Sequence, residues 1–80
     1  MLELLAYARL PRLFPLFIRY HLTATDERVR HWAATGFREL AKTHEGRKLL
    51  WDVYQYGMGL EMLAADERWR IQELLGTILN

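Results

Sequence analysis

Residues 24–40 read ATDERVRHWAATGFREL, and residues 64–80 read AADERWRIQELLGTILN. At an offset of 40 residues, the second stretch repeats six residues of the first. The identical pairs are Ala24/Ala64, Asp26/Asp66, Glu27/Glu67, Arg28/Arg68, Arg30/Arg70 and Gly36/Gly76. Because the matches share one order and one spacing, they indicate an internal repeat, which decides the fold prediction.

Each copy of this stretch is predicted to begin an amphipathic helix at an aspartate. Asp26 can accept the free amides of the first turn of a helix over 27–43. The inner face of that helix is a stripe at helical spacing, made of Val29, Ala33, Gly36, Phe37 and Leu40. Residues 44–46 are predicted to end it, with Gly46 in a left-handed C-terminal position. Asp66 is predicted to cap the last helix in the same way.

The segments around the repeat are also predicted to be helical. Residues 2–10 have short helical periodicity, and Pro11 breaks it and suits the first turn of the next helix, over 12–22. Residues 47–65 are predicted to form a third long helix, apolar nearly all round. A helix of that kind is either central to its fold or meets a partner.

The repeat extends into these preceding helices, where apolar residues again pair at the same offset. A period of ~40–47 residues built from helix pairs is typical of HEAT and armadillo arrays. The chain resembles a two-unit protein of this family. The residues that carry the resemblance are Asp26-Glu27-Arg28-Val29-Arg30, Ala33, Gly36 and Leu40 in the first unit, and Asp66-Glu67-Arg68-Trp69-Arg70 with Gly76 in the second.

Of four other positions, one agrees with the family pattern and three depart from it. Pro15 fits the family, in which proline is common in the first helix. Ala24 and Ala64 stand where the family often has a second acidic residue, and Glu73 stands where it has a small one. The resemblance implies an all-α fold of two stacked helical hairpins behind a short N-terminal helix. The alternative is an unrelated bundle with a duplicated hairpin.

The chain is predicted to be one domain over residues 1–80. Its parts are an N-terminal helix (1–10), repeat unit 1 (11–45) and repeat unit 2 (46–80). Two helical-repeat units leave faces that need capping, docking or dimerisation, because such arrays usually need three or more units.

Catalysis and cofactor binding find little support in the sequence. The chain has no serine and no cysteine, which excludes either residue as a nucleophile. Glu27 and His31 are four residues apart and could share a helix face, but zinc needs three or four ligands. No glycine-rich phosphate loop is present. We therefore expect no enzyme activity, no metal and no cofactor.

The charge pattern leaves nucleic-acid binding as an alternative function. The net charge is only +1. The basic residues that could follow a phosphate backbone are Arg28, Arg30, Arg38, Lys42 and Lys48. Acidic residues are interleaved with them, as on a solvated helix face. The N-terminus lacks the basic start of a signal peptide, and no uncharged run approaches the ~18–20 residues of a membrane span, so we expect a cytoplasmic protein.

The surplus of apolar residues favours a protein-binding function. Hydrophobic residues make up 51% of the chain, and aromatic residues and methionine are enriched in binding patches. The predicted partner-binding residues are Trp51, Tyr54, Met58 and Met62 on helix 47–65, edged by Arg12 and Arg19. The alternative is that helix 47–65 is simply central, and Trp32 and Trp69 are predicted to be core residues. The expected function is a small adaptor or inhibitor, with a homodimer as an open possibility.

Overall fold

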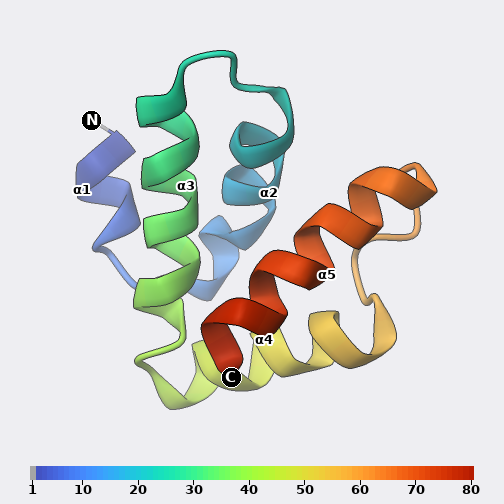
Figure 1. The fold of residues 1–80 in the computed structure, drawn as a ribbon. Helices are drawn as coiled ribbons and strands as arrows, with labels where there is room; N and C mark the ends of the chain where they lie inside the picture. The colour runs from blue at the N-terminus through green and yellow to red at the C-terminus, as the bar shows by residue number, and fades with distance from the viewer. Residues whose placement is uncertain (1) are drawn as a thin grey trace.

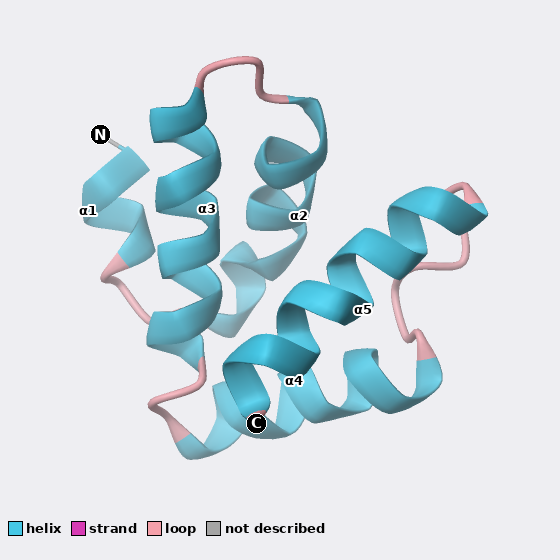
Figure 2. Cartoon of the chain, in the orientation of Figure 1, coloured by secondary structure: helices cyan, strands magenta, loops and turns pink. Residues whose placement is uncertain are grey.

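The computed structural model describes residues 2–80, which form five α-helices and one short 3-10 helix. The elements are α1 (Leu2–Ala6), η1 (Pro11–Leu13), α2 (Phe14–Thr23), α3 (Glu27–Leu40), α4 (His44–Tyr56) and α5 (Ala65–Leu79). Over residues 2–80 there is no strand, and short loops join the helices (Figure 2). The prediction of an all-α fold is confirmed.

The helices form two antiparallel pairs that cross each other (Figure 1). Residues 24–26 turn α2 back onto α3, and α1 packs on another side of α3. Helix α4 runs across the end of the first pair, and α5 folds back over α4 and reaches α3. Two helical hairpins are therefore present, whereas their stacking as HEAT-like units stays a prediction.

The N-terminal helix is shorter than predicted. Helix α1 ends at Ala6, four residues before the predicted end at residue 10. Arg9 follows with a φ of 56°, a left-handed conformation that ends right-handed helix, and its Nε lies 3.0 Å from Glu39 Oε1. The break before Pro11 is confirmed, and Pro11 starts η1.

The N-terminus of α3 is as predicted, but its C-terminus is not. Asp26 Oδ1 accepts a hydrogen bond from the Arg28 amide at 2.9 Å, so Asp26 is the N-cap. Helix α3 ends at Leu40, and the predicted left-handed role of Gly46 is wrong. Thr43 Oγ1 instead accepts the Gly46 amide at 3.0 Å and caps α4. Gly46 lies in the first turn of α4, where a Cβ would collide with the Leu40 carbonyl.

The predicted helix over 47–65 is wrong in its second half. Helix α4 ends at Tyr56, because Gly57 takes a φ of 66° and Gly59 a φ of 81°. Glycine adopts these left-handed angles without steric cost, and a right-handed helix cannot contain them. Residues 57–64 are therefore a loop, and Met58 and Met62 lie on it rather than on a helix.

Helix α5 begins at Ala65, so Asp66 lies in its first turn and is not the predicted N-cap. The Ala64 amide donates to Glu67 Oε1 at 3.1 Å. This is the half of a capping box that a glutamate three residues into a helix supplies. The two aspartates of the repeat therefore have different roles, with Asp26 as a cap and Asp66 inside the helix.

The core lies where the two helix pairs meet. Its centre is aromatic, since the Phe14 and Phe17 rings have centroids 5.2 Å and 6.2 Å from that of Phe37. The buried apolar residues of this cluster are Phe14, Phe17, Ile18, Ala33, Phe37, Leu40, Leu50, Val53, Leu60, Ile71, Leu75 and Leu79. Every helix from α2 to α5 contributes to it, which fixes the crossing of the pairs.

The two tryptophans predicted to be core residues differ. Trp32 is half-buried on α3, with its ring centroid 6.1 Å from that of Tyr7. Trp69 is 64% exposed, so its core assignment is wrong. The buried face of α5 is formed by Ile71, Leu75 and Leu79, and Trp69 lies outside that face.

Candidate functional site

A groove lies between α2 and the loop after α4. Two adjoining cavities of about 320 Å³ each form it, and they share Pro15, Ile18 and Gly59. The remaining residues that line them are Pro11, Arg12, Phe14, Arg19, Leu22, Thr23, Leu49, Val53, Met58, Leu63 and Glu67. We call this feature the α2 groove.

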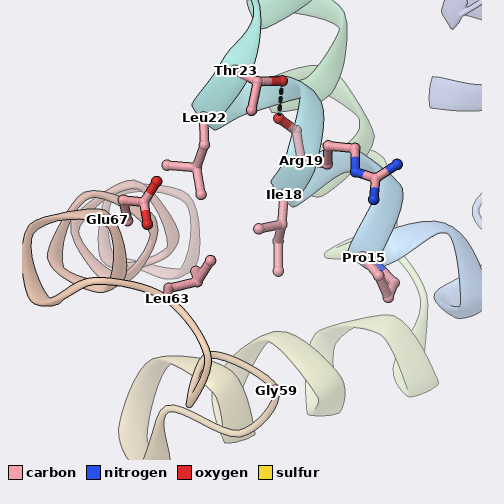
Figure 3. A pocket seen from close by; sticks show the side chains of 8 residues that line it. All are labelled: Pro15, Ile18, Arg19, Leu22, Thr23, Gly59, Leu63 and Glu67. Atoms are coloured by element: carbon pink, nitrogen blue, oxygen red, sulfur yellow. Dashed lines mark hydrogen bonds between the residues drawn. The ribbon is translucent and has the colours of Figure 1, made fainter.

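The apolar wall of the α2 groove comes from one face of α2. Pro15, Ile18 and Leu22 recur at spacings of three and four residues and so lie on one side of the helix. Figure 3 shows Ile18, Leu22 and Leu63 pointing into the same space, with Glu67 on the opposite side from α2. The two glycine angles at 57 and 59 turn the loop so that Leu63 and Met58 face α2 rather than continuing α4.

Two arginines lie along the outer edge of α2. Arg12 and Arg19 are exposed and, with Pro15 and Leu16, line a third hollow of about 350 Å³. Among the described residues, neither guanidinium is within 4.0 Å of a carboxylate. The carboxylate of the other wall is already used, since Glu67, in the first turn of α5, accepts the Ala64 amide. The groove thus has two arginines along η1 and α2 and one glutamate on the opposite wall.

Large apolar side chains are exposed at the rim on the loop side. Tyr56 is 73% exposed, Met58 51% and Met62 96%. Burying such surface releases about 25 cal/mol per Å². Contact of this end of the molecule with another molecule would therefore be favourable.

The six predicted partner-binding residues do not form one surface. Arg12, Arg19 and Met58 meet at the α2 groove, and Met62 lies on the same loop. Trp51 and Tyr54 are half-buried against the core, with ring centroids 5.7 Å apart. The Tyr54 ring also packs on Gly76, where a Cβ would lie 2.8 Å from it.

Sequence reasoning missed the α2 side of the groove. The sequence places Ile18 and Leu22 in the apolar stripe of the helix over 12–22, and it places Gly59 and Leu63 on the predicted helix over 47–65. The available signal was the pair of glycines at 57 and 59, which mark a helix end more often than a helix interior. A loop predicted after residue 56 would have indicated α2 as the opposite wall of a groove.

The five basic residues of the nucleic-acid alternative are dispersed and partly paired. Lys42 Nζ lies 2.7 Å from Glu39 Oε2, and Arg28 lies 3.5 Å from Asp26 Oδ2. Arg30 is half-buried, whereas Arg38 and Lys48 are exposed on α3 and α4 respectively. A phosphate backbone is bound by a continuous row of free cations. The dispersed and partly paired basic residues therefore favour nucleic-acid binding less than the groove favours protein binding.

The surroundings of Glu39 and of His21 shift the pKa of each group, and neither residue lines the groove. The Lys42 ammonium, followed by the Arg9 guanidinium, holds the pKa of the buried Glu39 carboxyl below its usual value, against the opposing effect of burial. Burial, followed by the positive charges of Arg70 and Arg30, lowers the pKa of His21. Both groups act on stability rather than on chemistry at the site.

Comparisons of the chain with protein-family models, with curated proteins and with solved structures find no match. Within residues 2–80, no three acidic, histidine or cysteine side chains gather to hold a metal ion. Nor does any helix of the described chain have the length and apolar character needed to cross a membrane. The function must therefore be argued from the groove itself.

Proposed function

We propose that this protein is a non-catalytic protein-interaction module, a small adaptor or inhibitor that binds a larger protein. The observation that carries the proposal is the apolar α2 groove beside Met58 and Met62, which are 51% and 96% exposed. Methionine is flexible and polarizable and adapts to the shape of a partner. Exposed apolar groups that line a concave surface are typical of binding sites.

The proposed binding surface revises the one expected from sequence. It keeps Arg12, Arg19, Met58 and Met62, and it replaces Trp51 and Tyr54 by the α2 wall. A cytoplasmic location and a HEAT-like origin of the two hairpins remain part of the proposal. Both are compatible with a helical scaffold that presents a surface and performs no reaction.

Capture experiments with matched variants test this function. Wild type and Met58→Glu would be used to retain proteins from a lysate of the source organism, with Leu4→Glu as the control. Leu4 is 71% exposed on α1, so its variant adds the same charge away from the groove. We expect Met58→Glu to lose a protein that wild type and Leu4→Glu retain. The same retained set for all three proteins would overturn the proposal.

Salt dependence separates this function from nucleic-acid binding. Binding through phosphate contacts weakens steeply with added salt, whereas an apolar protein interface responds little. Retention of a protein that weakens only slightly from 50 to 200 mM salt therefore supports protein binding. Retention of nucleic acid that is lost over the same range, and lost in Arg38→Glu, would favour the alternative.

A further inference from the structure

We propose that the occupant of the α2 groove is an amphipathic helix of a partner protein, with two carboxylates two turns apart that meet Arg12 and Arg19. This inference rests on the proposed function and names the chemistry of its partner. It follows from the shape of the groove, from the unpaired charges on its edge, and from the poor match that the acidic face of α5 offers in a second copy.

The shape of the groove suits a short helix. Its α2 wall extends over residues 11–23, which corresponds to roughly 18 Å at the rise of a helix. About twelve residues of partner helix would cover that length. Helices bind grooves through apolar side chains at i, i+3 or i+4, and i+7. Pro15, Ile18 and Leu22 present apolar surface at the same spacings.

The charges on the groove favour an acidic partner in one orientation. Arg12 in η1 and Arg19 in α2 are seven residues apart, which is about 10 Å at the rise of a helix. Carboxylates at i and i+7 of a helix have the same separation. Because Glu67, in the first turn of α5, lines the wall opposite α2, the acidic side of the partner would face α2 and not that wall.

The loop edge leaves room for this partner. Gly59 lines both cavities, and an atom placed at its Cβ position would have no neighbour within 4 Å. The partner backbone can therefore approach Gly59 closely. Met58 can then adjust its rotamer to cover the apolar side of the incoming helix.

A second copy of this chain fits less well. The outward acidic residues of α5 are Asp66 and Glu73, which are also seven residues apart and exposed. Arg70 lies between them on the same outward face and is exposed too. It would face Arg12 and Arg19 with like charge, which opposes binding. A foreign helix without such a residue is the better match.

The test uses a displayed library of random 16-residue peptides selected on the wild-type protein. The most enriched peptide would be synthesised with a fluorophore, and its Kd measured by fluorescence anisotropy. We expect apolar residues at helical spacing with two acidic residues seven positions apart. Charge reversal in Arg12→Glu/Arg19→Glu should weaken binding by at least about tenfold, since rim and buried charge pairs both contribute.

The control is Arg38→Glu/Lys48→Glu, which changes the net charge equally away from the groove. It should alter the Kd less than about threefold, because distant charges act mainly through screened long-range forces. A peptide with both acids changed to lysine should bind the Arg12→Glu/Arg19→Glu protein better than it binds wild type. Circular dichroism would verify that each variant keeps its helices.

The alternative outcomes separate the two proposals. If Met58→Glu abolishes binding but both charge variants behave alike, the acidic-helix inference is wrong and the proposed function stands. If no peptide binds, or binding ignores Met58→Glu, both proposals fail. A dimer seen by light scattering without peptide, and lost in Met58→Glu, would assign the groove to a second copy and overturn the inference.

Discussion

Gly36 shows how a single residue sets the distance between two helices. A Cβ at this position would lie 2.7 Å from the Phe17 ring, closer than real atoms approach. The repeat-equivalent Gly76 meets the Tyr54 ring in the same way. The two rings are 37 residues apart in the chain although the two glycines are 40 apart. In the second pair, the ring that meets the glycine therefore lies about three residues earlier in the first helix than the 40-residue repeat predicts.

Replacing Gly36 by alanine should overpack the contact between α2 and α3. We expect Gly36→Ala to lower the free energy of unfolding by about 1–3 kcal/mol, because Phe17 is fully buried and has little room to move. Urea unfolding followed by circular dichroism measures this change. Thr35→Ala is the matched control on the same helix and should stay within about 0.5 kcal/mol of wild type. An unchanged Gly36→Ala protein would show that Phe17 adjusts without cost.

At the scale of elements, the start of each helix depends on which side chain caps it. Thr43, rather than a glycine stop, decides where α4 begins, because its hydroxyl satisfies the Gly46 amide. Sequence reasoning found Asp26 because a good cap preceded a clear apolar period. It missed the Thr43 cap because Gly46 resembled a glycine that ends a helix. The capping signal of Thr43 and the stop signal of Gly46 lie within four residues of each other.

Removing the Thr43 cap should destabilise α4 alone. We expect Thr43→Ala to cost about 1 kcal/mol of stability, the usual loss for an N-cap serine or threonine. Thr25→Ala is the control, because Thr25 is exposed and lies beside a position where Asp26 already caps α3. Hydrogen exchange should show faster exchange in the first turn of α4 for Thr43→Ala only. Equal losses in both variants would contradict the cap assignment.

The end of α4 is decided by backbone conformation rather than by hydrophobic period. Gly57 has a φ of 66°, and alanine pays about 1–2 kcal/mol in that left-handed region. We therefore expect Gly57→Ala to lower stability by about 1 kcal/mol, as measured by thermal unfolding. Gln55→Ala, at an exposed position within α4, is the control and should be nearly neutral. A stabilised Gly57→Ala protein would mean that α4 can continue into the loop.

At the scale of the whole molecule, three titrating groups link the fold to pH. The pKa of His21 is lower in the folded protein than in the unfolded chain. At a pH between these two pKa values, His21 is therefore protonated in the unfolded chain and neutral in the folded protein. Stability should therefore fall as pH drops below 6.5, until the pH passes the lowered pKa of the folded state. His21→Gln should remove this part of the pH dependence in unfolding measurements between pH 7.5 and 5. An equal slope in His21→Gln and wild type would refute it.

The carboxylates Glu39 and Asp26 should produce a second, more acidic loss. Their pKa values are lowered in the folded protein, Glu39 chiefly by Lys42 and Asp26 chiefly by the Arg28 amide. Stability from such groups is present above the unfolded-state pKa of about 4 and is lost as pH falls through the folded-state values. Glu39→Gln should flatten stability between pH 5 and 2 relative to wild type. The ion pair of Glu39 with Arg9 also holds the segment after α1 on α3, so we expect this segment to detach first.

The sequence by itself determined the all-α class, the Asp26 cap and the apolar stripes that face the core. These depend on near neighbours, since period and capping act within a few residues. Only the tertiary structure decided that Trp69 faces solvent and that Met58 meets α2 across a groove. Exposure and groove formation depend on which helix covers which face. That choice is made by packing between residues far apart in the chain, and no local pattern encodes it.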